Sequence, residues 1–253
     1  MSRQAPFAVP PAVRRTGAGR SRRLTLATLD SVPGLAHAFS LRNSTPEAIL
    51  RAAMPAATPL RLLRQVHGAA VRVVGEGATT KAADGGTPEG DALVTDRTAV
   101  AIGVRVADCA PILVCDPVRR GIAAVHAGWR GTVAGVLTAT LETLTRRFGA
   151  SAADLRLAIG PAIGPCCFEV GDEVVDSLLG HDPGAVTCVR LEGRRRLVDL
   201  IEANRRQALA AGVPPAQIRS ANLCTACHPE LFLSYRREPA TAGRMLAFIG
   251  WAD

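Results

Sequence analysis

The sequence predicts a single domain of mixed α/β (α+β) class, in which helices flank a mixed β-sheet. From residue 60 onward, short apolar segments typical of strands alternate with segments of helical periodicity. No linker or internal repeat interrupts this alternation, and 253 residues are enough to enclose a sizeable core. We therefore expect a flexible tail rich in Arg and Pro at residues 1–25 and one domain at residues 26–253.

Strands rich in Val, Ile and Ala form the first part of this domain. They are expected at residues 92–96, 100–106, 110–116 and 121–127. The last two are joined by DPVRRG (116–121), a short turn that contains proline, so we expect them to pair antiparallel.

Helices alternate with further strands in the second part of the domain. One helix is expected to begin near Thr132, where apolar residues recur every three or four positions, and to end at Gly149. The other elements are, in chain order, a strand at 155–160, a short helix at 171–179, a hairpin within 185–200, a helix capped by Asp199 that ends near Gly212, and a strand at 245–251.

The composition argues against nucleic-acid and membrane partners. The net charge is +8, but only Lys81 among the 30 basic residues is a lysine, a skew that indicates genome composition as much as a basic surface. Six Phe, two Trp and one Tyr offer few platforms for stacking bases. No segment approaches the ~20 apolar residues of a membrane span.

The N-terminal segment indicates the compartment and, with it, the state of the cysteines. It lacks the apolar stretch of roughly 7–15 residues that a secretory signal contains, so we expect a cytoplasmic protein. Its Arg-rich, acid-free composition also fits an organelle-targeting peptide, although a flexible tail is the expected state. In a reducing compartment, seven cysteines are thiols or metal ligands rather than disulfides.

The antiparallel pair brings two reactive side chains together. If Asp116 faces Gly121, then Pro111 faces His126, and Cys109 lies on the same strand face as Pro111. A thiol and an imidazole so placed can hold one metal ion or form a nucleophile–base pair.

A third group comes from the segment RQVHG. His67 lies there, and with Cys109 and His126 it would supply three protein ligands and leave a fourth tetrahedral position open, as in catalytic zinc sites. His37 and His181 have less distinctive surroundings, and we expect them to be packed or exposed side chains.

The segment CTACH (224–228) has the C-x-x-C-H pattern of c-type haem attachment. Haem attachment needs an export context that the N-terminus does not supply. A zinc site would need two more ligands, and Cys166 and Cys167 are adjacent and cannot form a second C-x-x-C. A redox pair stays open, but thiols in a structured loop are the expected state.

Several polar residues near these groups are further candidates. Asp91, Asp96 and Asp108 could orient a metal-bound imidazole or a water molecule, although most such aspartates cap turns. Arg130, just before the expected helix, could bind an anion such as phosphate together with helix N-terminal amides.

Taken together, several segments of the chain resemble the YfiH-type laccase-domain family. These segments are RQVHG, GDALVTD, VADCAPILVCDP, AAVHAGWRG, AIGPAIGPCCFEVGDEV, CTACHPELFLSYRRE and AGRMLAFIG, in matching order over about residues 60–251. Members are described as purine nucleoside phosphorylases with adenosine deaminase activity, and have also carried the labels polyphenol oxidase and peptidoglycan editing factor.

The resemblance implies a catalytic domain with a zinc triad at His67, Cys109 and His126. It also implies purine nucleosides and phosphate as substrates. Our candidate substrate-binding residues, chosen from their positions in the sequence, are Arg130 and Asp108. Copper could occupy the same ligands adventitiously. Two alternatives remain: a metal-free Cys-His amide hydrolase acting on peptidoglycan precursors, with Cys109 as nucleophile and His126 as base, and a zinc-containing binding protein without turnover.

Overall fold

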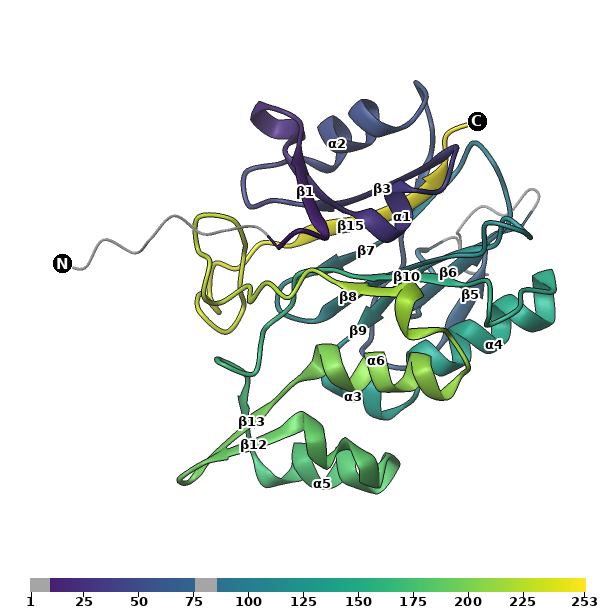
Figure 1. Ribbon diagram of the computed structural model, residues 1–253. Helices are drawn as coiled ribbons and strands as arrows, with labels where there is room; N and C mark the ends of the chain where they lie inside the picture. The colour runs from purple at the N-terminus through teal and green to yellow at the C-terminus, as the bar shows by residue number, and fades with distance from the viewer. Residues whose placement is uncertain (1–9, 76–85) are drawn as a thin grey trace.

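Two mixed β-sheets stack face to face in the computed structural model of the protein, which describes residues 10–75 and 86–253 (Figure 1). A helix covers the outer face of the first sheet, and a group of helices covers the outer face of the second. The sequence predicted a mixed sheet flanked by helices, and the described residues divide it into two large sheets and a small one.

The first sheet joins segments from both ends of the chain. Its spatial order is β1 (Val13–Thr16), β2 (Arg23–Leu26), β3 (Leu35–Ser40), β15 (Met245–Trp251), β7 (Ala101–Val106) and β4 (Leu60–Arg61). All neighbours are antiparallel except β4 and β7, which run parallel.

The second sheet carries the strands that the sequence identified most clearly. Its order is β14 (Ile218–Ser220), β10 (Arg156–Ile159), β8 (Ala110–Cys115), β9 (Ile122–Ala127), β6 (Ala92–Thr95) and β5 (Val71–Val73). The pairs β10–β14 and β5–β6 are parallel, and the others are antiparallel. A small antiparallel sheet contains β11 (Glu169–Val170), β13 (Arg195–Val198) and β12 (Val189–Glu192).

The helices of the described residues are shorter than the ~20 residues that a membrane-spanning helix needs. The α-helices are α1 (Ala27–Asp30), α2 (Pro46–Ala53), α3 (Trp129–Val133), α4 (Val136–Phe148), α5 (Asp172–His181) and α6 (Leu200–Ala210). The 3-10 helices are η1 (Gly19–Ser21), η2 (Pro183–Cys188) and η3 (Pro215–Gln217). Within the described ranges, no helix has both the length and the apolar character needed to cross a membrane.

The central strands are buried on both faces, which explains why their sequences are continuously apolar. Along β8, Leu113 and Cys115 pack between the two sheets, whereas Ile112 and Val114 pack against the helical layer with residues of α4 and α6. On the first sheet, Phe248 of β15 packs outward against α2. This layering fixes the ends of β8 and β9 relative to the helices around them.

Most predicted elements of the second half are confirmed to within a few residues. The helix expected at Thr132 is two helices, because Gly135 adopts a left-handed φ of +76° between α3 and α4. Gly149 ends α4, and Asp199 caps α6 by accepting a hydrogen bond from the Glu202 amide. The helix expected to end before Gly180 continues to His181.

The N-terminal region requires a correction. The flexible tail expected through residue 25 is instead, from residue 10 onward, a hairpin of β1 and β2 at the edge of the first sheet. Leu24 and Leu26 of β2 are fully buried in the core between the sheets, which holds the hairpin in place. Residues 1–9 lie outside the described residues.

Acidification from pH 7 to pH 5 is expected to lower the free energy of unfolding through His37. This imidazole is buried in β3, and its Nε2 accepts a hydrogen bond of 2.9 Å from the Leu26 amide. Burial and, secondarily, the charge of Arg23 lower the pKa of His37 from 6.5 to about 4. Between these values the unfolded chain binds a proton that the folded chain excludes, so stability falls as the pH falls through this window. At about 1.4 kcal/mol per pKa unit, we expect a loss of ~2 kcal/mol by pH 5.

Urea unfolding of the protein and of His37→Gln at pH 7 and pH 5 checks this expectation. Glutamine can accept the same hydrogen bond but does not titrate, so the variant is expected to lose clearly less stability on acidification. Equal losses in the two proteins would assign the pH dependence to other groups.

Candidate metal centre and its cavity

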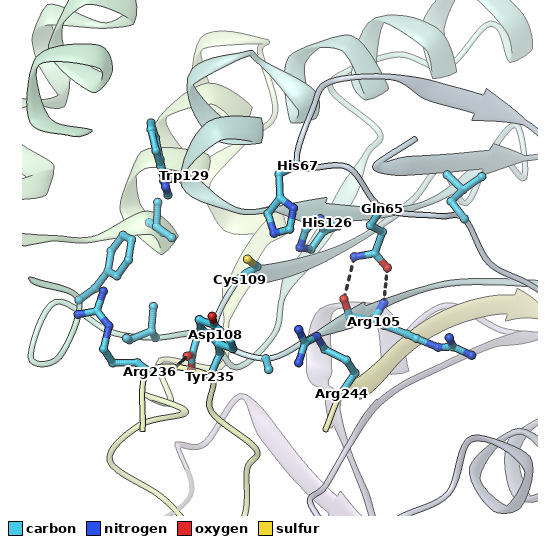
Figure 2. A pocket seen from close by; sticks show the side chains of 15 residues that line it. Gln65, His67, Arg105, Asp108, Cys109, His126, Trp129, Tyr235, Arg236 and Arg244 are labelled. Atoms are coloured by element: carbon cyan, nitrogen blue, oxygen red, sulfur yellow. Dashed lines mark hydrogen bonds between the residues drawn. The ribbon is translucent and has the colours of Figure 1, made fainter. Parts of the chain in front are cut away.

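Three potential ligands meet at one end of the second sheet (Figure 2). His126 lies on β9, Cys109 directly precedes β8, and His67 lies in the loop between β4 and β5. Their ligand atoms lie within 4.8 Å of one another. The two imidazole rings cross at 77°, with their centroids 4.8 Å apart. We refer to His67, Cys109 and His126 as the His-Cys-His triad.

The strand register predicted from the sequence explains why Cys109 and His126 lie close together, but not why His67 joins them. Pro111 of β8 pairs with His126 of β9, as the turn at residues 116–121 required. Cys109 therefore lies diagonally across from His126 on the same face of the sheet. His67 enters from a loop, and a separate interaction must hold it in place.

Asp91 supplies that interaction. Its carboxylate is fully buried and accepts hydrogen bonds from the backbone amides of Val66 (3.3 Å), His67 (2.9 Å) and Gly68 (2.8 Å). His67 itself has a left-handed φ of +60°, a strained backbone conformation for a residue with a side chain. Three successive amides directed at one carboxylate stabilise this turn and orient the imidazole toward Cys109 and His126.

The same carboxylate orients His126. Asp91 Oδ1 lies 2.8 Å from His126 Nδ1. A proton on Nδ1 leaves Nε2 as the nitrogen free to bind a metal ion, and this arrangement is typical of metal-binding histidines. Asp91 was one of three aspartates that the sequence offered for this role, and the structure places it in contact with the triad.

Hydrogen bonds within the triad and to Asp91 shift the pKa values of Cys109 and His126. Burial alone would raise the pKa of the Cys109 thiol, but its hydrogen bonds with His126 and His67 outweigh burial and lower the pKa from 9.0 to about 7. Burial likewise opposes protonation of His126, but the hydrogen bonds to Asp91 and Cys109 raise its pKa to about 9. A thiolate at neutral pH is both a soft metal ligand and a nucleophile.

Two glycines of HAGWRG leave room for this arrangement. A Cβ atom on Gly128 would lie 3.0 Å from Cys109 Sγ and 3.2 Å from His67 Cδ2. A Cβ atom on Gly131 would lie 3.0 Å from the Gly68 carbonyl oxygen. The glycines therefore allow the start of α3 to approach the His67 loop closely.

Gly128→Ala is expected to weaken metal binding by about tenfold, the lower end of what changes around a metal site cost. The added methyl group must push Cys109 or His67 by a few tenths of an ångström, while the core stays intact. Competition of zinc against a chromophoric chelator measures the affinity. Gly180→Ala is the control, because its Cβ atom would meet nothing within 4 Å, and an equal effect of both substitutions would contradict the steric argument.

A cavity of about 630 Å³ opens beside the triad, within the usual range for small-molecule sites. Aromatic and aliphatic side chains cover part of its wall, and three arginines cover another part. These aromatic and cationic lining residues are Trp129, Phe168, Tyr235, Arg105, Arg236 and Arg244. Figure 2 shows the Arg244 guanidinium reaching into the cavity from the C-terminal loop.

The two substrate-binding candidates from the sequence have different surroundings. Asp108 lines the cavity, but its carboxylate accepts hydrogen bonds from the Thr225 hydroxyl and from the Arg236 amide (2.7 Å). Arg130 is exposed and lies outside the cavity lining, with its guanidinium stacked 4.2 Å from the ring centre of Trp129. The structure thus gives Asp108 a positioning contact and places Arg130 against Trp129, outside the residues that line the cavity.

The arginines of the cavity were missed by reasoning from the sequence. Arg236 and Arg244 come from residues 231–244, a loop in which no regular element signals a site. The only signal was their membership in segments that carry the family resemblance, FLSYRRE and AGRMLAFIG.

Fold and site together define a class of protein: a mixed α/β protein with a candidate His-Cys-His metal centre beside a small-molecule cavity. The family described as "Multi-copper polyphenol oxidoreductase laccase" matches residues 43–252. The chain belongs to this family, and its relatives include proteins of the YfiH and YlmD types.

The similar proteins carry the names of purine nucleoside enzymes. The purine nucleoside phosphorylase YlmD of Geobacillus stearothermophilus is 42% identical over 193 residues, which cover 74% of this chain and 70% of YlmD. The adenosine deaminase RL5, from an unknown prokaryotic organism, is 39% identical over 188 residues, or 72% of this chain and 71% of RL5. The crystal structure of YlmD from Geobacillus stearothermophilus has a TM-score of 0.84 at 30% identity and covers 96% of this chain and 100% of that chain. These relatives support an enzymatic function.

The family description names a multicopper enzyme, but this chain lacks the ligands for a full multicopper centre. Such a centre needs many imidazole ligands, and the sequence contains five histidines. In the part of the chain that the structure describes, the triad brings together two of them, and the other cluster of potential ligands consists of cysteines alone.

Proposed function

We propose that the protein is a zinc-dependent purine nucleoside enzyme. It cleaves adenosine, inosine or methylthioadenosine with phosphate, and it deaminates adenosine hydrolytically. The observation that carries the proposal is the position of the His-Cys-His triad at the wall of a cavity with aromatic and cationic linings. The names of the relatives supply the substrate class.

The donor atoms of the triad fit zinc. Two imidazoles and one thiolate form a ligand set typical of catalytic zinc, and the Asp91 hydrogen bond fixes the tautomer of His126 that such a site requires. When bound, zinc supplies a Lewis acid with an open position that lowers the pKa of a water molecule to about 7.

The remaining residues of the cavity bind and orient the substrate. Trp129, Phe168 and Tyr235 offer flat apolar surfaces on which a purine base can stack. Asp108 acts indirectly, because its bonds to Thr225 and Arg236 hold two segments of the wall together. These contacts place the base and ribose beside the triad and exclude bulk water.

An anion site is needed for phosphorolysis, in which phosphate takes the ribosyl group from the base. We place it at Arg244, whose guanidinium enters the cavity. Arg236 lines another part of the cavity wall, where its guanidinium lies over the ring of Phe168. The Arg236 guanidinium is oriented by hydrogen bonds to the carbonyl oxygens of Cys167 (3.2 Å) and Glu169 (2.9 Å). Arg130, proposed from the sequence, is the second candidate.

Incubation of the zinc-loaded protein with adenosine, with and without phosphate, tests the proposal. We expect inosine in both reactions and adenine with ribose 1-phosphate only where phosphate is present. The absence of every one of these products would overturn the proposal.

Arg244→Ala is expected to raise the KM for phosphate about tenfold or more, while deamination changes little, because a lost charge-assisted contact to an anion costs roughly 1.5–3 kcal/mol. Arg130→Ala is the matched comparison and is expected to change the KM for phosphate less than twofold. The reverse ranking would move the anion site to the start of α3.

One observation favours a second candidate, the metal-free Cys-His hydrolase. Asp91, His126 and Cys109 follow one another as orienting acid, base and nucleophile, and the Cys109 pKa of about 7 suits a thiolate nucleophile. The second imidazole, His67, is unnecessary in such a dyad but completes a metal site. Activity that is lost with a chelator and restored by zinc supports the metalloenzyme, whereas full activity in metal-free protein supports the dyad. Metal binding without turnover of any nucleoside would indicate the third alternative, a zinc-containing binding protein.

A further inference from the structure

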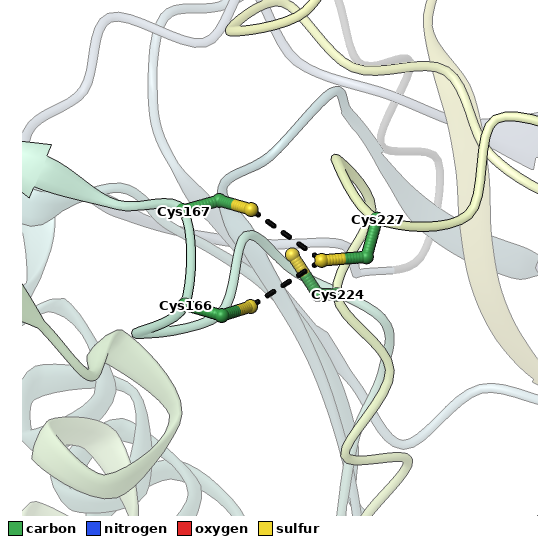
Figure 3. Close-up of side chains that lie close together, drawn as sticks. All are labelled: Cys166, Cys167, Cys224 and Cys227. Carbon is green, nitrogen blue, oxygen red and sulfur yellow. Dashed lines mark hydrogen bonds between the residues drawn. The ribbon is translucent and has the colours of Figure 1, made fainter.

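Four cysteine side chains converge in a second cluster that shares no residue with the triad (Figure 3). Cys166 and Cys167 lie in the turn before β11, and Cys224 and Cys227 lie in the loop after β14. Their Sγ atoms all lie within 4.8 Å of one another. Cys166 and Cys167 are adjacent and form no second C-x-x-C, but two separate loops each bring two thiols into the cluster, which the spacing in the sequence does not indicate.

Backbone hydrogen bonds hold the two loops in register. The Thr225 amide donates to the Ala162 carbonyl (3.0 Å), and the Ala162 amide donates to the Leu223 carbonyl (3.2 Å). These bonds form a parallel bridge between Ala162 and Cys224. The thiols are therefore brought together by the fold itself, as a preformed ligand set requires.

We propose that these four cysteines bind one structural zinc ion. Cys227 Sγ lies 3.4 Å from the Sγ atoms of both Cys166 and Cys167. Tetrahedral zinc with Zn–S bonds of about 2.3 Å separates its sulfur ligands by roughly 3.8 Å, close to this spacing. A disulfide would require about 2.05 Å between two sulfurs, and it would leave the other two thiols without a role.

The surroundings suit a closed tetrathiolate site. The Gly164 amide donates a hydrogen bond of 3.2 Å to Cys224 Sγ, as outer contacts to metal-bound thiolates do. Cys166 and Cys227 are exposed, so an ion can enter from solvent. Binding exchanges four thiol protons, released to solvent, for one Zn²⁺, and no electrons are transferred. With four protein ligands and no open position, the ion has a structural role.

The site fastens together two loops that contact residues of the cavity wall. Phe168, next to Cys167, lines the cavity, and the Cys167 carbonyl accepts a hydrogen bond from the Arg236 guanidinium. On the other loop, Thr225 is hydrogen-bonded to Asp108. A metal ion that links the loops would hold Phe168 and Arg236 in position without touching the substrate.

Metal analysis of the full chain tests the proposal. The protein is stripped with chelator under reducing conditions, reloaded with zinc chloride and passed through a desalting column. We expect about two equivalents in the unsubstituted protein and about one in Cys109→Ala, held by the four cysteines. Cys224→Ser and Cys227→Ser together in the Cys109→Ala background leave two ligands at each cluster and are expected to retain none, whereas Cys188→Ala, a buried cysteine outside both clusters, leaves the metal content of that background unchanged.

Alkylation followed by peptide mapping provides a second readout that does not depend on a variant folding. In the zinc-loaded protein, the four cysteines are expected to react with iodoacetamide at least tenfold more slowly than after addition of a chelator. Equal rates with and without chelator, a disulfide within the cluster, or iron in place of zinc in protein as purified would overturn the proposal. Neither readout depends on nucleoside turnover, so failure here is distinct from failure of the proposed function.

Discussion

Replacing His67, Cys109 or His126 with alanine is expected to abolish both nucleoside reactions and metal binding at the triad. Two remaining ligands are too few to hold zinc firmly, so affinity is expected to fall by more than about 100-fold, beyond the range seen for changes to residues that contact ligands. Nucleoside turnover and zinc content at the triad are expected to fall together. Elemental analysis and product formation from adenosine measure the two effects in the same samples.

The three variants are expected to differ in stability. Stability measurements therefore distinguish the loss of a metal ligand from damage to the fold. His67 is exposed in its loop, so His67→Ala is expected to unfold at the same urea concentration as the unsubstituted protein when both are metal-free. His126→Ala leaves the buried Asp91 carboxylate without one partner, which costs roughly 1–3 kcal/mol. His181→Ala, at an exposed position on α5, is the control. Normal turnover by any triad variant would contradict the assignment of the site.

Asp91→Asn is expected to produce the second-largest loss. The amide keeps the shape of the carboxylate, but its NH₂ group must face either the backbone amides of the His67 loop or His126 Nδ1, all of which need an acceptor. We expect zinc affinity at the triad to fall 10- to 100-fold. We also expect the free energy of unfolding to fall by roughly 1–3 kcal/mol, because a buried donor is left unsatisfied.

Asp96→Asn is the matched control for this prediction. Asp96 follows β6 at its other end and is exposed, so the same chemical change there is expected to alter neither zinc affinity nor stability measurably. Zinc titration and urea unfolding of both variants check the result. Unchanged zinc affinity in Asp91→Asn would show that the acid is dispensable for orienting the imidazole.

The sequence predicts the four central strands of the second sheet, β10, β8, β9 and β6, because its information there is local. The strands are continuous apolar segments, and the short turn at 116–121 sets the register of β8 and β9, which places Cys109 beside His126. The contribution of Asp91 could not be derived in this way, because it lies 35 positions from His126 and acts through a backbone turn.

The division of the strands into two sheets also could not be predicted from local sequence patterns. β15 could be recognised as a strand, but its partners β3 and β7 are distant in the chain, and no local pattern identifies them. In β1, only Val13 of VRRT is buried, so its arginines give the segment the character of a polar tail. The four-cysteine cluster was missed for a related reason, since the spacing within each loop says nothing about the distance between loops.

The position of β15 has a consequence for biosynthesis. This strand, residues 245–251, lies between β3 and β7 and forms hydrogen bonds with both. Until it emerges from the ribosome, the nascent chain presents two apolar strands with open backbone edges, which are templates for pairing with other chains. Protection by chaperones is therefore expected to matter from the emergence of β3 and β7 onward, and the first sheet can close only when residues 245–251 have left the ribosome.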